Sequence, residues 1–142
     1  MKEYVVCFIF TTCLENVWLI SKIKPEWQKG SLNGIGGKVE YNETYKQAAE
    51  REIKEEAGVD ISNLIDIGYM EGINNDNNKF KVEVFTAIYD KPLNTMEDEV
   101  IFKYPLNDIK KFKLVENVPL LIETCIYRLN SNSNFKNIIL NY

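Results

Sequence analysis

Three glutamates near the middle of the chain have the residue type and the spacing to bind a metal ion. Glu52, Glu55 and Glu56 lie at i, i+3 and i+4, so on a helix their side chains share one arc. Carboxylates this close repel one another unless a cation lies among them. Hard divalent ions such as Mg²⁺ take oxygen ligands and also hold substrate phosphates. The alternative is that these glutamates form a solvated helix face without a functional role, as clustered glutamates usually do.

The residues around these glutamates predict one helix of about four turns. Thr44 and Gln47 have the spacing of a capping box at its start, and Gly58 suits a left-handed cap at its end. Ahead of the helix, Gly36 and Gly37 allow unusual backbone angles that could turn a carbonyl or amide toward the glutamates. Apolar residues that recur every four positions form a narrow stripe for packing on a sheet: Ala49, Ile53 and Ala57.

Strands are predicted on both sides of this helix, followed by a closing helix. Residues 22–34 form a loop-like segment, residues 74–78 a polar turn and residues 96–100 an acidic loop. We expect strands at 4–13, 17–20, 61–71, 80–89 and 135–142, and a second helix at 119–129. This order of elements indicates one α+β domain over residues 1–142, an α/β/α sandwich.

Composition narrows the function. The 142 residues carry a net charge of −4, so no basic field exists to hold a nucleic-acid polymer, and a small anionic substrate fits better. The absence of histidine excludes Ser-His or Cys-His catalysis and histidine metal sites. The apolar N-terminal run is too short and too poor in cleavage signals for a signal peptide. We expect a cytoplasmic protein without a membrane segment, with three free, buried thiols: Cys7, Cys13 and Cys125.

A longer spacing pattern runs through the glutamate segment. Gly37, five residues, Glu43, seven residues, Arg51-Glu52-Ile53, one residue, Glu55-Glu56, one residue and Gly58-Val59 agree with the Nudix box at every specified position. The chain therefore resembles the Nudix hydrolase family. The resemblance implies a mixed sheet between helices, with the signature at 37–59 forming a loop, a helix and a second loop.

The resemblance also implies a metal site. It makes Mg²⁺ the expected cofactor, with Mn²⁺ as a substitute, held by the carboxylates of Glu52, Glu55 and Glu56 and by the Gly36 carbonyl. Glu52 is the expected general base, with Glu55 and a later loop glutamate as competitors. Arg51 belongs to the same catalytic set.

Two further positions resemble family features that support this site. Arg51 and Glu43 resemble a pair that braces the loop against the helix. Glu99 resembles an additional acidic ligand from a loop beyond the box, with Glu97 as the alternative. The alternative is that Glu99 is an ordinary solvated acid of a loop, without a functional role.

Two asparagines resemble base-reading residues of the MutT-type branch. Asn33 opens a segment similar to one in eukaryotic oxidised-purine enzymes, and Asn117 precedes a proline as in bacterial MutT. An amide offers a donor and an acceptor to a base edge, although Asn117 also suits a plain helix cap. Lys22, Trp27 and Lys38 complete the expected substrate-binding set, where Trp27 either stacks on a base or covers the edge of the core. The Trp-x-Asp-Asp segment of the eukaryotic enzymes is missing.

The resemblance implies hydrolysis of a nucleoside triphosphate to a monophosphate and pyrophosphate, by water attack at phosphorus. Oxidised purines such as 8-oxo-dGTP are among the candidate substrates. The alternatives are a pyrophosphatase for ADP-ribose or a nucleotide-sugar, and a non-catalytic nucleotide-binding module. We expect a monomer or homodimer.

Overall fold

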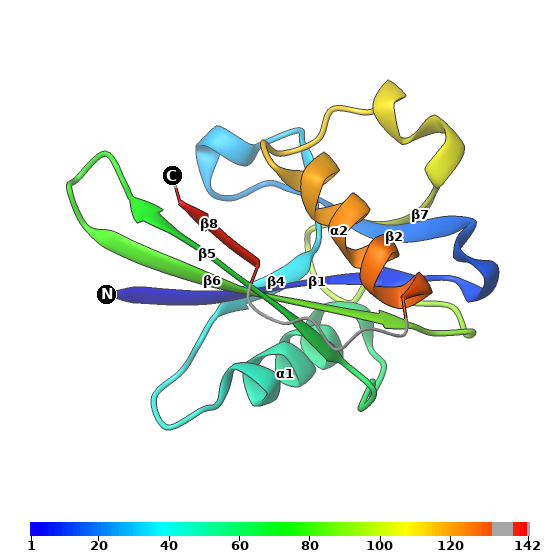
Figure 1. The fold of residues 1–142 in the computed structure, drawn as a ribbon, viewed down its shortest axis with the longest axis horizontal. Coiled ribbons are helices and arrows are strands. Elements are labelled where there is room, and N and C mark those ends of the chain that lie inside the picture. The colour runs from blue at the N-terminus through cyan, green and yellow to red at the C-terminus, as the bar shows by residue number, and fades with distance from the viewer. Residues whose placement is uncertain (132–137, 142) are drawn as a thin grey trace.

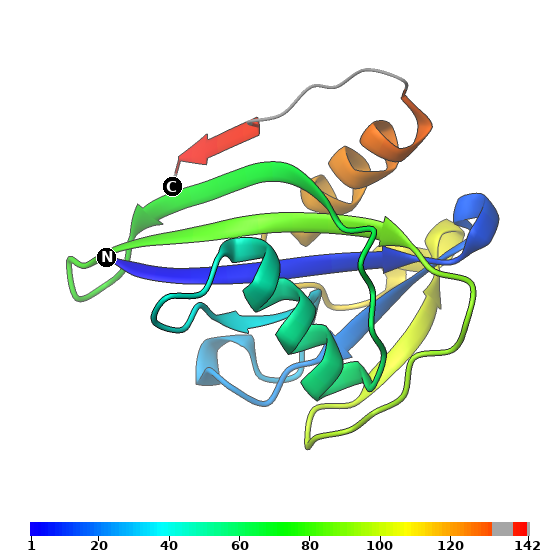
Figure 2. The same ribbon diagram turned by 90° about the horizontal axis from the view of Figure 1, so that it is seen from below.

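The computed structural model describes residues 1–131 and 138–141. Within these residues a mixed eight-stranded sheet lies between two helices, α1 (Tyr45–Ala57) and α2 (Val118–Asn130). Figures 1 and 2 show the two helices on opposite faces of the sheet. This arrangement confirms the predicted α+β sandwich.

The sheet branches at its first strand, β1. The middle of β1, from Tyr4 to Cys7, pairs with β4, whereas its last two residues pair with β2. On its other edge β1 runs parallel to β6, and β5 runs parallel to β8, while the remaining pairs are antiparallel. The strands are β1 (Lys2–Phe10), β2 (Asn16–Ser21), β3 (Leu32–Asn33), β4 (Ile35–Lys38), β5 (Ile65–Ile73), β6 (Lys79–Ile88), β7 (Ile101–Pro105) and β8 (Ile138–Asn141).

Alternating side chains of the sheet form one apolar layer under each helix. On the α1 side, Val5, Cys7 and Ile9 of β1 pack with the small apolar stripe of α1. On the α2 side, Phe8 and Phe10 pack with the buried face of α2. The period of two in β1 thus serves both layers, which is why its sequence is apolar at nearly every position.

The ends of α1 match the predicted caps. Thr44 accepts a hydrogen bond from the Gln47 amide at 3.1 Å, and the Gln47 side chain accepts one from the Thr44 amide at 2.9 Å. Gly58 adopts the left-handed conformation with φ of 74°. The predicted stripe of Ala49, Ile53 and Ala57 is fully buried against the sheet. The helix that carries the glutamates is therefore fixed at both ends and along one face.

Several predicted boundaries were wrong. The segment 61–64 was predicted as strand, but β5 begins at Ile65, because Ile61 and Leu64 are buried core residues without a strand partner. The predicted loop at 22–34 contains β3, and β4 begins directly after it although two of its four residues are glycines. The second helix was predicted at 119–129, and α2 extends only one residue further at each end. Of the last predicted strand, residues 135–137 and 142 lie outside the described residues.

Cys13 also differs from expectation. Cys7 and Cys125 are buried free thiols, but Cys13 is exposed in a short turn of 3-10 helix, η1 (Thr12–Leu14), where it has a positive φ of 68°. Burial raises the pKa of Cys125 to about 12, so this thiol stays protonated. In residues 1–131 and 138–141 no helix is long and apolar enough to cross a membrane.

Candidate functional site

The three signature glutamates differ in how far α1 exposes them. The side chain of Glu52 is 12% exposed and that of Glu55 is 50% exposed. Glu56 is buried, with 9% of the residue exposed. The interpretation of these glutamates as a solvated helix face is therefore wrong for Glu52 and Glu56, because most of each side chain is shielded from solvent.

Arg51 is the cation that lies among these acids in this structure. Its guanidinium forms a bidentate pair with Glu43, with distances of 2.7 and 3.0 Å, and reaches the Lys38 carbonyl at 2.9 Å. One nitrogen of the same group donates to Glu52 at 2.9 Å and to Glu55 at 3.2 Å. The Arg51–Glu43 pair therefore braces α1 against the end of β4, and Arg51 also offsets the charge of two signature glutamates.

Glu56 is the carboxyl group that lacks such compensation. Its Oε2 atom is buried without a hydrogen-bond partner. Burial and the neighbouring Glu52 carboxylate raise the pKa of Glu56 to about 8, although Lys22 and the Gly36 amide act in the opposite direction. Burial also raises the pKa of Glu52, while the Arg51 hydrogen bond lowers it and the nearby charges of Glu55 and Glu97 raise it further.

The carboxylates of Glu52, Glu55 and Glu56 suit a divalent cation chemically, although in this structure they do not converge on one point. In the described ranges, 1–131 and 138–141, no three acidic, cysteine or histidine side chains have the geometry of a metal site. The carboxylates of Glu52 and Glu55 are instead engaged by hydrogen bonds from Arg51. An orphaned buried carboxylate oxygen beside two further carboxylates is nevertheless the oxygen-rich environment that Mg²⁺ prefers.

The glycines of β4 bring the backbone close to these acids. A Cβ atom on Gly37 would overlap the Glu52 carboxylate, 2.6 Å from its carbon and 2.9 Å from its Oε2 atom. A Cβ atom on Gly36 would lie 2.8 Å from the Val5 carbonyl carbon in β1. Glycine is thus required at 37 so that the carboxylate can lie against the strand, and at 36 so that β4 can pair with β1.

The acidic loop between β6 and β7 is fastened to the C-terminal end of α1. The Asn94 amide donates to the Ala57 carbonyl and the Met96 amide to the Glu56 carbonyl, both at 3.1 Å. These are two of the carbonyls that a helix leaves without intrahelical partners. The Met96 side chain lies where a Cβ atom on Gly58 would be, 3.0 Å from its sulfur. These contacts place the loop acids Glu97 and Glu99 beside the signature helix.

Glu99 is held firmly by the segment that follows β2. Its Oε1 atom accepts from Lys22 Nζ at 2.8 Å, and its Oε2 atom accepts from the amides of Ile23 at 2.6 Å and Lys24 at 3.1 Å. Burial by itself raises the pKa of Glu99, but these hydrogen bonds outweigh burial and lower the pKa overall. Glu99 is therefore not a solvated loop acid. The Lys22–Glu99 pair had no sequence signal, because 76 residues separate the two positions.

The predicted base-reading asparagines differ in their surroundings. Asn33 donates to Gln28 at 3.3 Å and accepts from the Gly34 amide at 2.7 Å, so its amide is already engaged. Asn117 stands at the start of α2 with φ of 72°, and its side chain makes no cap hydrogen bond. Asn117 is therefore the N-cap residue of α2, as the alternative interpretation expected, but its side chain does not serve as the cap. Trp27, in the short helix η2 (Glu26–Gln28), is 71% exposed and does not cover the core edge.

An apolar row crosses the α2 side of the sheet and ends at Lys38. Strand register aligns Lys38 with Tyr4, Tyr4 with Val82 and Val82 with Met70. Tyr4, Val82 and Met70 are only partly buried, so part of each side chain remains accessible, although Val82 and Met70 also pack against the core. Sequence reasoning missed this row, because its residues have the same alternation as the core.

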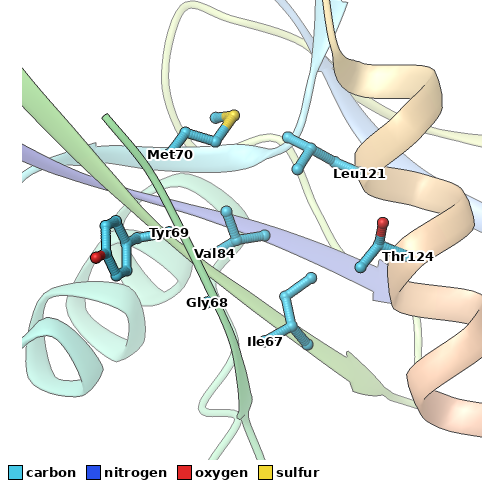
Figure 3. Close-up of a pocket in the computed structure, with 7 residues that line it drawn as sticks. All are labelled: Ile67, Gly68, Tyr69, Met70, Val84, Leu121 and Thr124. Atoms are coloured by element: carbon cyan, nitrogen blue, oxygen red, sulfur yellow. The ribbon is translucent and has the colours of Figure 1, made fainter. Parts of the chain in front are cut away.

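A small pocket lies at the far end of this row, between the sheet and α2 (Figure 3). Leu121 and Thr124 of α2 face Ile67, Met70 and Val84, whereas Tyr69 points to the opposite side of the sheet. Its cavity volume of about 10 Å³ is far below the roughly 300–1,000 Å³ of most ligand pockets. This pocket alone is too small to hold a nucleotide.

Known proteins share this fold. The chain is 44% identical over 50 residues to the oxidized purine nucleoside triphosphate hydrolase of Danio rerio, and the match spans 35% of this chain and 32% of that protein. The NUDIX domain of Shewanella oneidensis NrtR, solved with ADP ribose, has a TM-score of 0.78 at 18% identity, covering 90% of this chain and 88% of the other. A MutT protein of Bacillus halodurans has a TM-score of 0.73 at 16% identity, covering 98% and 87%.

The family assignment rests on the match to the whole domain. The family model described as NUDIX domain matches residues 2–118, which is most of the chain and includes β1, the signature helix and the acidic loop. The fold and the residues around α1 agree with this match. The chain therefore belongs to the Nudix hydrolase family.

Proposed function

We propose that this protein hydrolyses a nucleoside triphosphate to the monophosphate and pyrophosphate, with a divalent cation as cofactor. The observation that carries this proposal is the buried, unpartnered Glu56 carboxylate oxygen beside Glu52 and the two glycines of β4. Burying a carboxyl group without a hydrogen-bond partner lowers the stability of the fold. A carboxyl group in this situation is therefore a candidate for binding a ligand.

Glu52, Glu55, Glu56 and the Gly36 carbonyl would hold the cation, with Mg²⁺ the expected ion and Mn²⁺ a substitute. When bound, the cation supplies Lewis acidity at the phosphoryl oxygens and lowers the pKa of a water ligand. For Glu52 and Glu55 to turn toward the ion, they must give up their hydrogen bonds to Arg51. Arg51 remains anchored by Glu43, so this exchange leaves the brace of α1 intact.

The remaining residues bind and orient the substrate. Glu52 is proposed to accept the proton of the attacking water, because burial raises the pKa of its carboxylate, and Glu55 is the competitor. Lys22 lies close enough to Glu56 to affect its pKa, so it can reach a phosphate group bound there. The Asn117 amide and the apolar row from Tyr4 to Met70 suit the polar edge and flat face of a base.

The substrate class is the finer part of the proposal. The Danio rerio relative acts on oxidised purine nucleoside triphosphates, which favours 8-oxo-dGTP and related nucleotides. The NrtR domain binds ADP ribose in a similar fold, which supports ADP-ribose or a nucleotide-sugar as the second candidate. We further propose a cytoplasmic monomer or homodimer, consistent with the free thiols of Cys7 and Cys125.

A turnover screen with separated products tests this proposal. Wild type, Glu55→Gln and the matched control Glu50→Gln, which removes an acid of α1 outside the cluster, would be assayed with Mg²⁺ on dATP, dGTP, 8-oxo-dGTP, ADP-ribose and a sugar nucleotide. We expect monophosphate and pyrophosphate from a triphosphate, with about 10²–10³-fold slower turnover in Glu55→Gln only. Two monophosphates from ADP-ribose would replace the substrate assignment, and equal turnover in both variants would refute the site.

A further inference from the structure

The junction between β3 and β4 carries a pair of residues that can react with each other. Asn33 ends β3 and Gly34 leads into β4, and no other asparagine of the sequence is followed by glycine. The carboxamide carbon of an asparagine can form a five-membered ring with the backbone nitrogen of the next residue. Glycine leaves that nitrogen unobstructed, because it has no Cβ atom. By residue type, Asn33 is therefore the asparagine of this chain best suited to ring closure.

The structure holds the two reacting groups together. The Gly34 nitrogen lies 2.7 Å from Asn33 Oδ1 and donates a hydrogen bond to it. The carboxamide carbon is one C=O bond of about 1.23 Å from that oxygen, so it lies within about 3.9 Å of the nitrogen. Reacting atoms in a near-attack arrangement are about 3–3.5 Å apart. A small rotation of the Asn33 side chain therefore suffices to begin the reaction.

Packing keeps glycine at position 34. Gly34 is buried, and a Cβ atom there would lie 2.7 Å from the Cys7 carbonyl oxygen and 2.8 Å from a Val6 methyl carbon. A residue with a side chain, which would slow ring closure, has no room at this position. Asn33 itself is only partly buried, so water can reach its carboxamide. Its Nδ2 atom donates to Gln28 Oε1 at 3.3 Å, a long contact that restrains the amide only weakly.

We propose that Asn33 deamidates spontaneously in the folded protein, with the Gly34 nitrogen as the attacking group. The nitrogen loses its proton to hydroxide, and the N–Cγ bond forms. The Cγ–Nδ2 bond then breaks, and Nδ2 takes up a proton and leaves as ammonia. Water opens the resulting cyclic imide at either of its carbonyl groups. The products are an aspartate at position 33, or an isoaspartate in which the main chain runs through the side-chain carbon.

Either product alters the proposed substrate site. A carboxylate at position 33 cannot donate a hydrogen bond as the amide does, and it adds negative charge where an anionic substrate binds. An isoaspartate also lengthens the main chain by one carbon directly before β4, whose residues Ile35 to Lys38 pair with β1. Only this effect on turnover rests on the proposed function. The deamidation itself follows from the geometry of Asn33 and Gly34.

Peptide mass spectrometry of the ageing protein tests the proposal. Wild type would be incubated at mildly alkaline pH, folded and in guanidinium chloride, and positions 33 and 63 would be followed in tryptic peptides. Asn63 is the matched internal control, because its amide also donates a hydrogen bond at 3.3 Å, to the Ile88 carbonyl, but leucine follows it. In the folded protein we expect Asn33 to convert at least tenfold faster than Asn63, and no more than tenfold slower than in guanidinium chloride. The rate at position 33 should rise with hydroxide concentration.

Turnover on the best substrate gives a second readout. We expect kcat/KM to fall as the converted fraction grows, and Asn33→Asp to lower it at least tenfold. Conversion without loss of turnover would overturn the effect on the substrate site. The deamidation is refuted if position 33 stays intact in the folded protein while it converts in guanidinium chloride, or if it converts no faster than position 63. A protein that turns over no nucleotide would refute the proposed function, whereas the peptide masses would still decide the deamidation.

Discussion

Adding one methyl group at Gly37 should disable the site with little effect on the fold. A Cβ atom there would lie 2.6 Å from the Glu52 carboxyl carbon, whereas ordinary contacts begin at 3.4 Å. The backbone of Gly37 needs no positive φ, so alanine is compatible with the strand. The colliding atoms are the end of a flexible side chain, and we expect the Glu52 carboxylate to move by about 0.8 Å or more.

The size of the effect follows from this displacement. A misplacement of about 1 Å in a catalytic group costs roughly 10²-fold in rate. The fold loses the Arg51–Glu52 hydrogen bond, about 1.5–3 kcal/mol, and recovers about 0.4–1 kcal/mol because alanine restricts the unfolded chain. We therefore expect a net loss near 1–2 kcal/mol. In Gly36→Ala the added atom meets the backbone of Val5, which cannot turn away, so a loss of about 3 kcal/mol is expected.

Two measurements on each variant test this reasoning. Urea unfolding followed by tryptophan fluorescence gives the free energy of unfolding, and turnover on the best substrate gives kcat/KM, with the Mn²⁺ Kd as a second readout. A Gly37→Ala protein that keeps turnover and Mn²⁺ affinity within threefold of wild type would show that the position of Glu52 is unimportant. Equal destabilisation in both variants would show that Gly37 is required by the strand and not by the carboxylate.

Three further outcomes are expected. Arg51→Met should lower the free energy of unfolding by about 3 kcal/mol, because partly buried acids lose their cation. This loss corresponds to a decrease of roughly 6–12 °C in Tm, which calorimetry measures. A decrease of less than about 2 °C would refute the role of Arg51 in bracing α1. Burial and a neighbouring carboxylate raise the pKa of Glu83 to about 7, so the folded protein binds this proton more tightly and stability from Glu83 falls as pH rises from 4.5 to about 7. The difference in unfolding free energy between wild type and Glu83→Gln should therefore change by about 2 kcal/mol over that range, and a constant difference would contradict it. A thiol reagent should modify Cys13 quickly, and Cys7 and Cys125 only after denaturant is added.

Local chemistry accounts for what was predictable about α1. The capping box at Thr44 and the left-handed cap at Gly58 depend on residues at most four positions apart, and both were confirmed. The stripe of small apolar residues reports a helix packed on a sheet, and this too is a local pattern. The family spacing added the glutamates as metal ligands, which stays a prediction.

Patterns that arise from packing were misread. Residues 61–64 are apolar because Ile61 and Leu64 fill the core, not because they pair in a strand. The glycines of β4 look like a loop in the sequence, but they form a strand because neighbouring elements approach so closely that a side chain has no room. Composition of a short segment cannot distinguish these cases, since the cause lies in another part of the chain.

The sequence by itself determined the family and the signature helix, and it predicted which acids hold the cation. The tertiary structure decided how each acid is partnered: Arg51 holds Glu52 and Glu55, Glu56 keeps an unpartnered oxygen, and Lys22 holds Glu99 across 76 residues of sequence. Charge compensation depends on distances between atoms of about 3 Å, and only the folded chain sets those distances. Residue type and spacing therefore name the participants, while the fold assigns their roles.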